Sequence, residues 1–193
     1  MAITAKEVNQ LRQMTGAGMM DCKKALVEAE GDYDKAIELL RKKGQKVSAS
    51  RSDRETTEGI VLVKTNDYQT EGILIAFTCE TDFVAKNDDF NALGNEILEA
   101  AYTNRPADID ALKALPAGDI TLGEKIVENI GKIGEKLEIT AYETMTAEAV
   151  VPYIHAGSKL GVLVGLSNTS GTDVIEAGKD VAMQIAAMSP IAV

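Results

Sequence analysis

The sequence predicts an α+β protein, with an N-terminal three-helix bundle followed by a core of two related α+β subdomains that have antiparallel sheets and packed helices. Three observations support this fold class. Apolar residues recur at helical spacing through residues 1–46, a polar segment without periodicity follows at 47–57, and the period then changes to two. The 47–57 segment is predicted to be a linker. Beyond it, two strands and then a helix recur, which indicates subdomains at 58–136 and 137–193.

The first helix of the bundle begins after Thr4, because Thr4 and Glu7 have the spacing of a capping box. Gly16 and Gly18 end this helix, since glycine tolerates the positive φ of a tight reversal. The residues predicted on its apolar face are Val8, Leu11 and Met14.

The second helix has Asp21 near its N-terminus, where a negative charge is favourable, and it closes at Gly31. Asp32 caps the third helix, which is predicted to stop at Gly44 after three cationic residues. The residues predicted to face inward from these two helices are Cys22, Ala25, Leu26, Ala29, Ala36, Ile37 and Leu40.

The core is predicted to open with a β-hairpin and to close with a helix. Two prolines, Pro106 and Pro116, interrupt residues 104–119, which we expect to form a surface loop or a short helix. The predicted strands are 60–63, 73–77, 137–140, 150–154 and 160–164, and the predicted helices are 88–101, capped by Asp88 and Asp89, 122–133 and 174–188.

The composition of the 193-residue chain, 45% apolar and 26% charged, is close to the globular average, so the chain can bury a core. Its net charge of −10 argues against general nucleic-acid binding. The charge is uneven, because residues 1–54 carry 11 Lys and Arg against 8 Asp and Glu, whereas residues 55–193 carry 9 against 22. This asymmetry indicates two segments with different surfaces.

Motifs and composition exclude most catalytic chemistry. Cys22 and Cys79 lie far apart and form no CxxC pair, and a single histidine rules out histidine-rich metal sites. Neither a dinucleotide-binding glycine motif nor a P-loop is present. We therefore expect no enzymatic activity, no cofactor and no bound metal. The N-terminus has no signal-peptide core and no apolar stretch approaches the length of a membrane span, so we expect a cytoplasmic protein.

Two groups of polar residues have alternative interpretations. Asp88 and Asp89 could bind a cation, but the role of a helix cap is favoured. His155 follows a strand and could act as a base. Without a second histidine or a nucleophile motif, a surface or interface role for His155 is favoured.

Two segments do not fit an ordinary core. Met19 and Met20 follow a glycine turn, and both cannot face a core this small. Either one is buried, or both belong to a contact surface, and the sequence favours neither alternative. Further on, Phe83 either packs onto the following helix near Phe90, which composition favours, or is exposed as an interface anchor with the charge of Asp82 beside it.

These two segments, together with a third, carry a family resemblance. Residues 11–26, LRQMTGAGMMDCKKAL, closely resemble the N-terminal signature of the bacterial elongation factor Ts family. Residues 79–86, CETDFVAK, look like the second signature of that family, and residues 153–164, YIHAGSKLGVLV, are similar to a third characteristic stretch. The resemblance extends in order across the whole chain.

The resemblance implies a guanine-nucleotide exchange factor that acts on GDP-bound elongation factor Tu during protein synthesis. It also implies that residues 1–46 form a ubiquitin-associated (UBA)-like domain. We expect no direct nucleic-acid or membrane partner. The residues that the resemblance assigns to partner contacts are Arg12, Met19 and Met20 in the N-terminal domain, Thr81, Asp82, Phe83 and Val84 in an intruding loop, and Ile126 and His155 in the core.

We hypothesise that Phe83 wedges into an apolar slot beside the Mg²⁺ site of the GTPase, oriented by Asp82, and disturbs the contacts that hold Mg²⁺ and the GDP phosphates. The alternative hypothesis is a binding module that holds a partner protein without promoting exchange. Such a module needs the docking surface but no intruding loop.

The chain departs from the family pattern in two places. Ala76-Phe77-Thr78 stands where Glu-x-Asn is frequent, and Lys159 stands where arginine is frequent, which keeps the charge but loses the guanidinium fork. Family members usually continue into a dimerisation segment and a C-terminal module. We therefore expect the subdomain at 137–193 to be truncated, and any homodimer to form through a segment absent here.

Overall fold

The computed structural model describes residues 3–190, and the chain divides into two units. The first comprises Met1–Glu55 and Pro116–Leu137, and the second comprises Thr56–Leu115 and the residues from Glu138 onward. The α+β fold class is confirmed. The units differ from the predicted domains, because residues 116–137, assigned to the core by sequence, belong with the N-terminal helices. The end of the chain, on which the predicted truncation rests, lies partly outside the described residues.

The N-terminal helices of the first unit are α1 (Ala5–Thr15), α2 (Met19–Glu28) and α3 (Tyr33–Ser50). The predicted capping box at Thr4 is present, Gly16 ends α1 with a φ of 68°, and the Asp32 side chain accepts a hydrogen bond from the Lys35 amide to cap α3.

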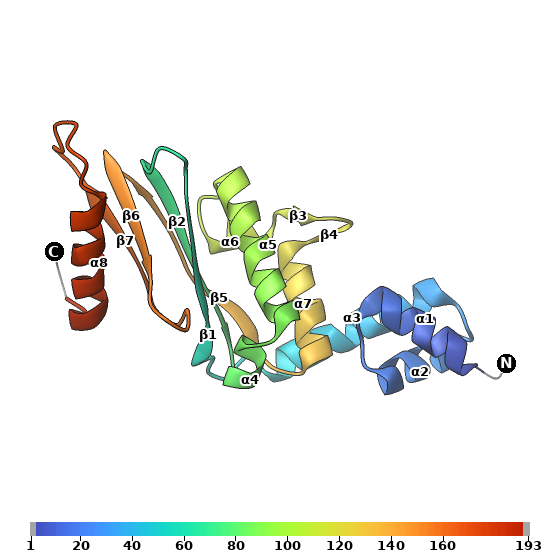
Figure 1. The fold of residues 1–193 in the computed structure, drawn as a ribbon. Coiled ribbons are helices and arrows are strands. Elements are labelled where there is room, and N and C mark those ends of the chain that lie inside the picture. Colours follow the sequence, from blue (N-terminus) through green and yellow to red (C-terminus); the bar gives the residue numbers. More distant parts are fainter. Residues whose placement is uncertain (1–2, 191–193) are drawn as a thin grey trace. The chain divides into compact units, whose positions relative to one another are not determined.

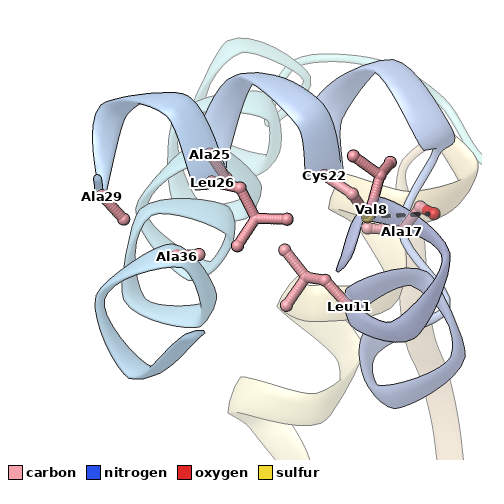
Figure 2. Close-up of a cluster of buried hydrophobic side chains, with 8 residues drawn as sticks. All are labelled: Val8, Leu11, Ala17, Cys22, Ala25, Leu26, Ala29 and Ala36. Carbon is pink, nitrogen blue, oxygen red and sulfur yellow. Dashed lines mark hydrogen bonds between the residues drawn. The ribbon is translucent and has the colours of Figure 1, made fainter. Parts of the chain in front are cut away.

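The inner faces of these three helices form one apolar cluster (Figure 2), in which the Cys22 thiol donates a 3.6 Å hydrogen bond to the Ala17 carbonyl. The buried members of the cluster are Val8, Leu11, Ala17, Cys22, Ala25, Leu26, Ala29 and Ala36. Met14, predicted on the inner face of α1, is 58% exposed instead, because Val8 and Leu11 already supply the buried face of this helix.

The predicted end of α3 at Gly44 is wrong. The helix continues to Ser50, so residues 47–50 of the predicted linker are helical. The reason is tertiary: α7 (Leu122–Ile133) packs against α3, and a Cβ atom on Gly131 would lie 2.7 Å from the Gly44 Cα atom. Gly44 therefore allows α3 and α7 to approach closely, and it does not end α3. An ion pair joins the same helices, with Arg41 Nε 2.7 Å from Glu128 Oε1.

The Gly131→Ala substitution tests this contact. On an open helix, alanine would stabilise the chain by about 1 kcal/mol relative to glycine. Here the added methyl group meets backbone, which cannot rotate away, and overpacking costs about 1–3 kcal/mol. We expect a net loss of stability in chemical denaturation. A gain in stability would contradict the close approach of the two helices.

The second unit is built on the predicted hairpin, formed by β1 (Glu58–Thr65) and β2 (Glu71–Cys79) in antiparallel pairing. Strand β5 (Leu137–Thr146) pairs with the other edge of β2 and completes a three-stranded sheet in the order β1-β2-β5. The subdomain boundary predicted at 137 therefore does not separate the two sheets. Strands β6 (Ala149–Ile154) and β7 (Gly161–Leu166) form a separate antiparallel pair.

The second unit is layered (Figure 1): α8 (Ile175–Met188) covers β6 and β7, this pair lies against the three-stranded sheet, and α5 (Asp88–Asn104) covers the opposite face of that sheet. Phe90, Leu93, Ile97 and Ala101 form the buried face of α5, and Phe90 stacks on Phe77 with ring centroids 4.5 Å apart. Asn87 caps α5 in place of the predicted Asp88 and Asp89, which instead lie in its first turn.

Three short elements complete the described residues. Helix α4 (Asp82–Ala85) lies between β2 and α5, and α6 (Ile109–Lys113) is the short helix that was one of the two alternatives for residues 104–119. Strands β3 (Pro116–Ala117) and β4 (Ile120–Thr121) form a small hairpin before α7 in the first unit.

Candidate functional site

Helix α4 is a single turn fastened to the end of the β1–β2 hairpin. Thr81, at its N-cap, has the extended backbone that starts a helix, and Ala85 is buried on its inner side. The Cys79 thiol, at the end of β2, donates a 3.2 Å hydrogen bond to the Thr81 carbonyl. One side of α4 is thus held by the sheet, and the opposite side faces outward.

The outward side of α4 carries Phe83, whose side chain is 83% exposed. The packing of Phe83 near Phe90, which composition favoured, is therefore wrong, and the exposed alternative is the one that the structure has. Phe90 is fully buried and already stacks on Phe77, so that partner is occupied. The other residues of this segment, Thr81, Asp82 and Val84, are half-buried. A large exposed aromatic side chain on a fixed backbone is the kind of group that anchors protein interfaces.

Asp82 and Lys86 form an ion pair across one turn of α4, with 2.7 Å between Asp82 Oδ2 and Lys86 Nζ. The hydrogen bond from Lys86 lowers the pKa of Asp82 below its ordinary value of 3.8, and the positive charge of Lys159 contributes in the same direction. The same hydrogen bond raises the pKa of Lys86, with a smaller contribution from Glu58. Asp82 therefore remains ionised beside Phe83 throughout the neutral range.

His155 lies in the turn between β6 and β7, also in the second unit, and is exposed. Its Nδ1 atom is 2.8 Å from the Tyr153 hydroxyl group. The turn is attached to the sheet, because the Val61 amide of β1 donates a 2.6 Å hydrogen bond to the Ser158 carbonyl. The favoured surface location of His155 is confirmed.

The first unit exposes a second apolar surface. Met19 and Met20, at the start of α2, are 52% and 63% exposed, so neither fills the core. Arg12 of α1 is also exposed. Sequence reasoning missed Met14 and Val27 as exposed members of this part of the chain, although Val27 lies seven residues after Met20 and hence on the same helix face.

Ile126 does not fit its predicted role. It is 5% exposed, on the buried face of α7 in the first unit, where the helix packs with Leu122 and Ile130 inward. The apolar spacing that predicted this helix also places Ile126 inside it. As a consequence, Ile126 offers almost no side-chain surface to a partner in this structure.

Within residues 3–190, no group of three or more histidine, cysteine, aspartate or glutamate side chains is arranged to hold a metal ion. No helix in the same range is long and apolar enough to cross a membrane.

Comparisons with known proteins show which family the sequence matches. The family model for elongation factor TS matches residues 80–193. The elongation factor Ts of Amoebophilus asiaticus is 59% identical over 193 residues, which is 100% of this chain and 70% of the relative. The chain belongs to the elongation factor Ts family.

Other relatives in the elongation factor Ts family agree. Those of Cytophaga hutchinsonii and Christiangramia forsetii are 55% and 56% identical over 191 residues, which is 98% of this chain and 69% and 68% of the relatives. Membership confirms the resemblance drawn from residues 11–26, 79–86 and 153–164, and it gives the chain a role in translation elongation.

The ion pair on α4 yields a prediction. Because the pKa of Asp82 is lowered in the folded chain, Asp82 contributes to folding stability above pH 3.8. This contribution is lost as the pH falls through the pKa that Asp82 has in the folded chain. The pKa of Lys86 is raised above 10.5 in the folded chain, so Lys86 contributes to folding stability below pH 10.5. This contribution is lost as the pH rises through the pKa that Lys86 has in the folded chain. Lys86→Met should move the pKa of Asp82 back toward 3.8, as followed by carboxyl ¹³C chemical shifts. An unchanged midpoint would show that Lys86 does not hold Asp82.

Proposed function

We propose that this chain is a guanine-nucleotide exchange factor for elongation factor Tu, and that Phe83 is the residue through which it promotes GDP release. The observation that carries the proposal is the exposure of Phe83 on a short helix whose other side is fixed to a sheet. Membership of the elongation factor Ts family supports the choice of reaction and partner.

The physical mechanism needs no covalent chemistry from this chain. A GTPase holds GDP through Mg²⁺ and through amides that contact the phosphates, and the octahedral Mg²⁺ site tolerates little distortion. An aromatic ring inserted beside that site shifts the elements that hold the ion. Loss of Mg²⁺ leaves phosphate charge uncompensated, and GDP then dissociates faster.

Asp82 gives the insertion a direction. Its carboxylate adjoins Phe83 on α4 and is neutralised by Lys86 in the free chain. This pair is exposed and of the i, i+4 type, so it holds the carboxylate only weakly. Asp82 can therefore exchange Lys86 for a hydrogen-bond donor of the GTPase at small cost when α4 inserts.

The exposed methionines of the first unit supply docking rather than exchange. Met19 and Met20 have flexible, polarisable side chains that adapt to a partner surface, and the guanidinium group of Arg12 adds a directional charge. These contacts bind the ground state and the transition state of exchange alike. They should therefore set the concentration of factor required and not the maximal rate.

The Phe83→Ala variant tests the proposal in an assay of fluorescent GDP release from elongation factor Tu. A buried aromatic anchor contributes about 2–4 kcal/mol to an interface. If this energy is realised only in the transition state, we expect stimulated release to slow by roughly 30- to 1,000-fold. Tyr68→Ala is the matched control, because Tyr68 is 87% exposed in the loop at the opposite end of the β1–β2 hairpin.

The possible outcomes separate the two hypotheses. Acceleration by the unmodified chain that Phe83→Ala loses and Tyr68→Ala keeps would establish exchange through α4. Co-elution with the GTPase without acceleration would favour a binding module that holds its partner without exchange. A loss of folding stability in Phe83→Ala with intact exchange would contradict the role of Phe83.

A second prediction concerns docking. The double substitution Met19→Ala and Met20→Ala should raise the concentration of factor that gives half-maximal exchange by roughly tenfold, which corresponds to about 1.4 kcal/mol. The maximal rate should change little. Met183→Ala on α8 is a control of the same residue type at an exposed position in the second unit. A fall in the maximal rate without a change in the half-maximal concentration would contradict a docking role.

A further inference from the structure

The turn between β6 and β7 is fixed at both of its ends. His155 and Leu160 are joined by a 2.9 Å backbone hydrogen bond, and the Ser158 amide donates to the His155 carbonyl at 2.9 Å. Ser158 has a φ of 55°, in the left-handed region that is costly for a residue with a side chain. Such a backbone persists only where its surroundings hold it, and the Val61 amide does so through the Ser158 carbonyl.

Lys159 extends from this turn to the start of β1. Its ammonium nitrogen lies 2.5 Å from Glu58 Oε2, and this ion pair is the contact that compensates that buried oxygen. The Lys159 side chain is 59% exposed and that of Glu58 is 26% exposed, so the pair differs from an ordinary surface salt bridge only in the burial of the Glu58 oxygen. Without Lys159, the buried carboxylate oxygen of Glu58 would have no cation beside it. The residues around Glu58 would then have to move or admit water.

Glu58 in turn adjoins the support of α4. It stands directly opposite Cys79 in the β1–β2 register, and Cys79 is the residue whose thiol holds the Thr81 carbonyl at the start of α4. Figure 1 shows the β6–β7 turn near the beginning of β1, and α4 packs against β1. The charges alternate across this region: Lys159, Glu58, Lys86 and Asp82. The influence of Lys159 on the pKa of Asp82, and of Glu58 on that of Lys86, agrees with this proximity.

We propose that Lys159 is a positioning residue which, through Glu58, holds the β6–β7 turn against the hairpin end that carries α4, so that His155 and Phe83 are presented in a fixed relation. The consequence for exchange rests on the proposed function. The positioning itself is a property of the free chain. Lys159 need not touch the partner to affect the rate, because it acts through the placement of α4.

Amide hydrogen exchange of the free chain tests the positioning. In Lys159→Met, we expect protection of the Val61 amide, of the Ala85 amide in α4 and of the Lys86 amide at its C-cap to fall by roughly 5- to 30-fold. Lys159→Arg, which retains the charge, should restore it, as should the exchanged pair Lys159→Glu with Glu58→Lys. Lys64→Met is the matched control, since Lys64 pairs with Glu99 between β1 and α5 in the same unit.

A second variant separates the two ion pairs. Lys86→Met removes the pair within α4 but leaves Lys159 with Glu58. It should lower protection in α4 and leave the Val61 amide unchanged. Equal protection of Val61 in Lys159→Met and in the unmodified chain would overturn the proposal, as would a failure of both Lys159→Arg and the exchanged pair to restore it.

Nucleotide release then connects the positioning to function. We expect Lys159→Met to lower the maximal rate of stimulated GDP release by roughly 5- to 30-fold while the half-maximal concentration changes less. If the unmodified chain itself fails to accelerate release, the proposed function fails and the hydrogen-exchange result still decides the positioning. If Phe83→Ala loses acceleration but Lys159→Met keeps it, the proposed function stands and the positioning role in exchange is overturned.

Discussion

The antiparallel register of β1 and β2 determines where the exposed groups of the second unit lie. Along β2, Ile73, Ile75, Phe77 and Cys79 are fully buried at alternate positions, and the residues between them are only partly buried. A shift of one residue would move this whole set to the other face. It would also remove Glu58 from its place opposite Cys79 and turn the start of α4 away from the sheet. The apolar alternation of one strand thus decides which way Phe83 points.

Local signals determined the helix starts, and packing determined some of the helix ends. The capping boxes at Thr4 and Thr121 need only residues three positions apart, and the predicted helix 122–133 has the bounds of α7. Gly44 has the same local signal as a true stop, since cations precede it. Its function becomes visible only with Gly131, which lies far along the chain. A single sequence cannot reveal that two distant glycines meet, so the linker was predicted to start too early.

The segments of the candidate site could be located from the sequence, but which of their side chains are exposed could not be predicted. The segments containing Met19 and Phe83 were identified because they fit poorly in a core, yet composition favoured burial of Phe83 beside Phe90. That preference was wrong, because Phe77 from β2 takes the stacking position against Phe90. Conversely, Ile126 was assigned to a contact by resemblance, although its own helical spacing already placed it inside. The exposure of a side chain depends on which other side chains pack against the same neighbours, and this packing is determined by the tertiary fold.

The support of α4 bears directly on the proposed exchange mechanism. A flexible loop carrying Phe83 would lose conformational freedom on insertion, and part of the binding energy would be lost with it. Here the Cys79 thiol holds the Thr81 carbonyl and Ala85 is buried, so in the proposed mechanism most of the energy gained by the ring acts on the partner. Coupling is reciprocal: a factor that weakens GDP binding is itself bound more weakly when GDP is present, by the same ratio. If the proposed mechanism holds, rebinding of nucleotide releases the factor, and a preorganised wedge acts repeatedly.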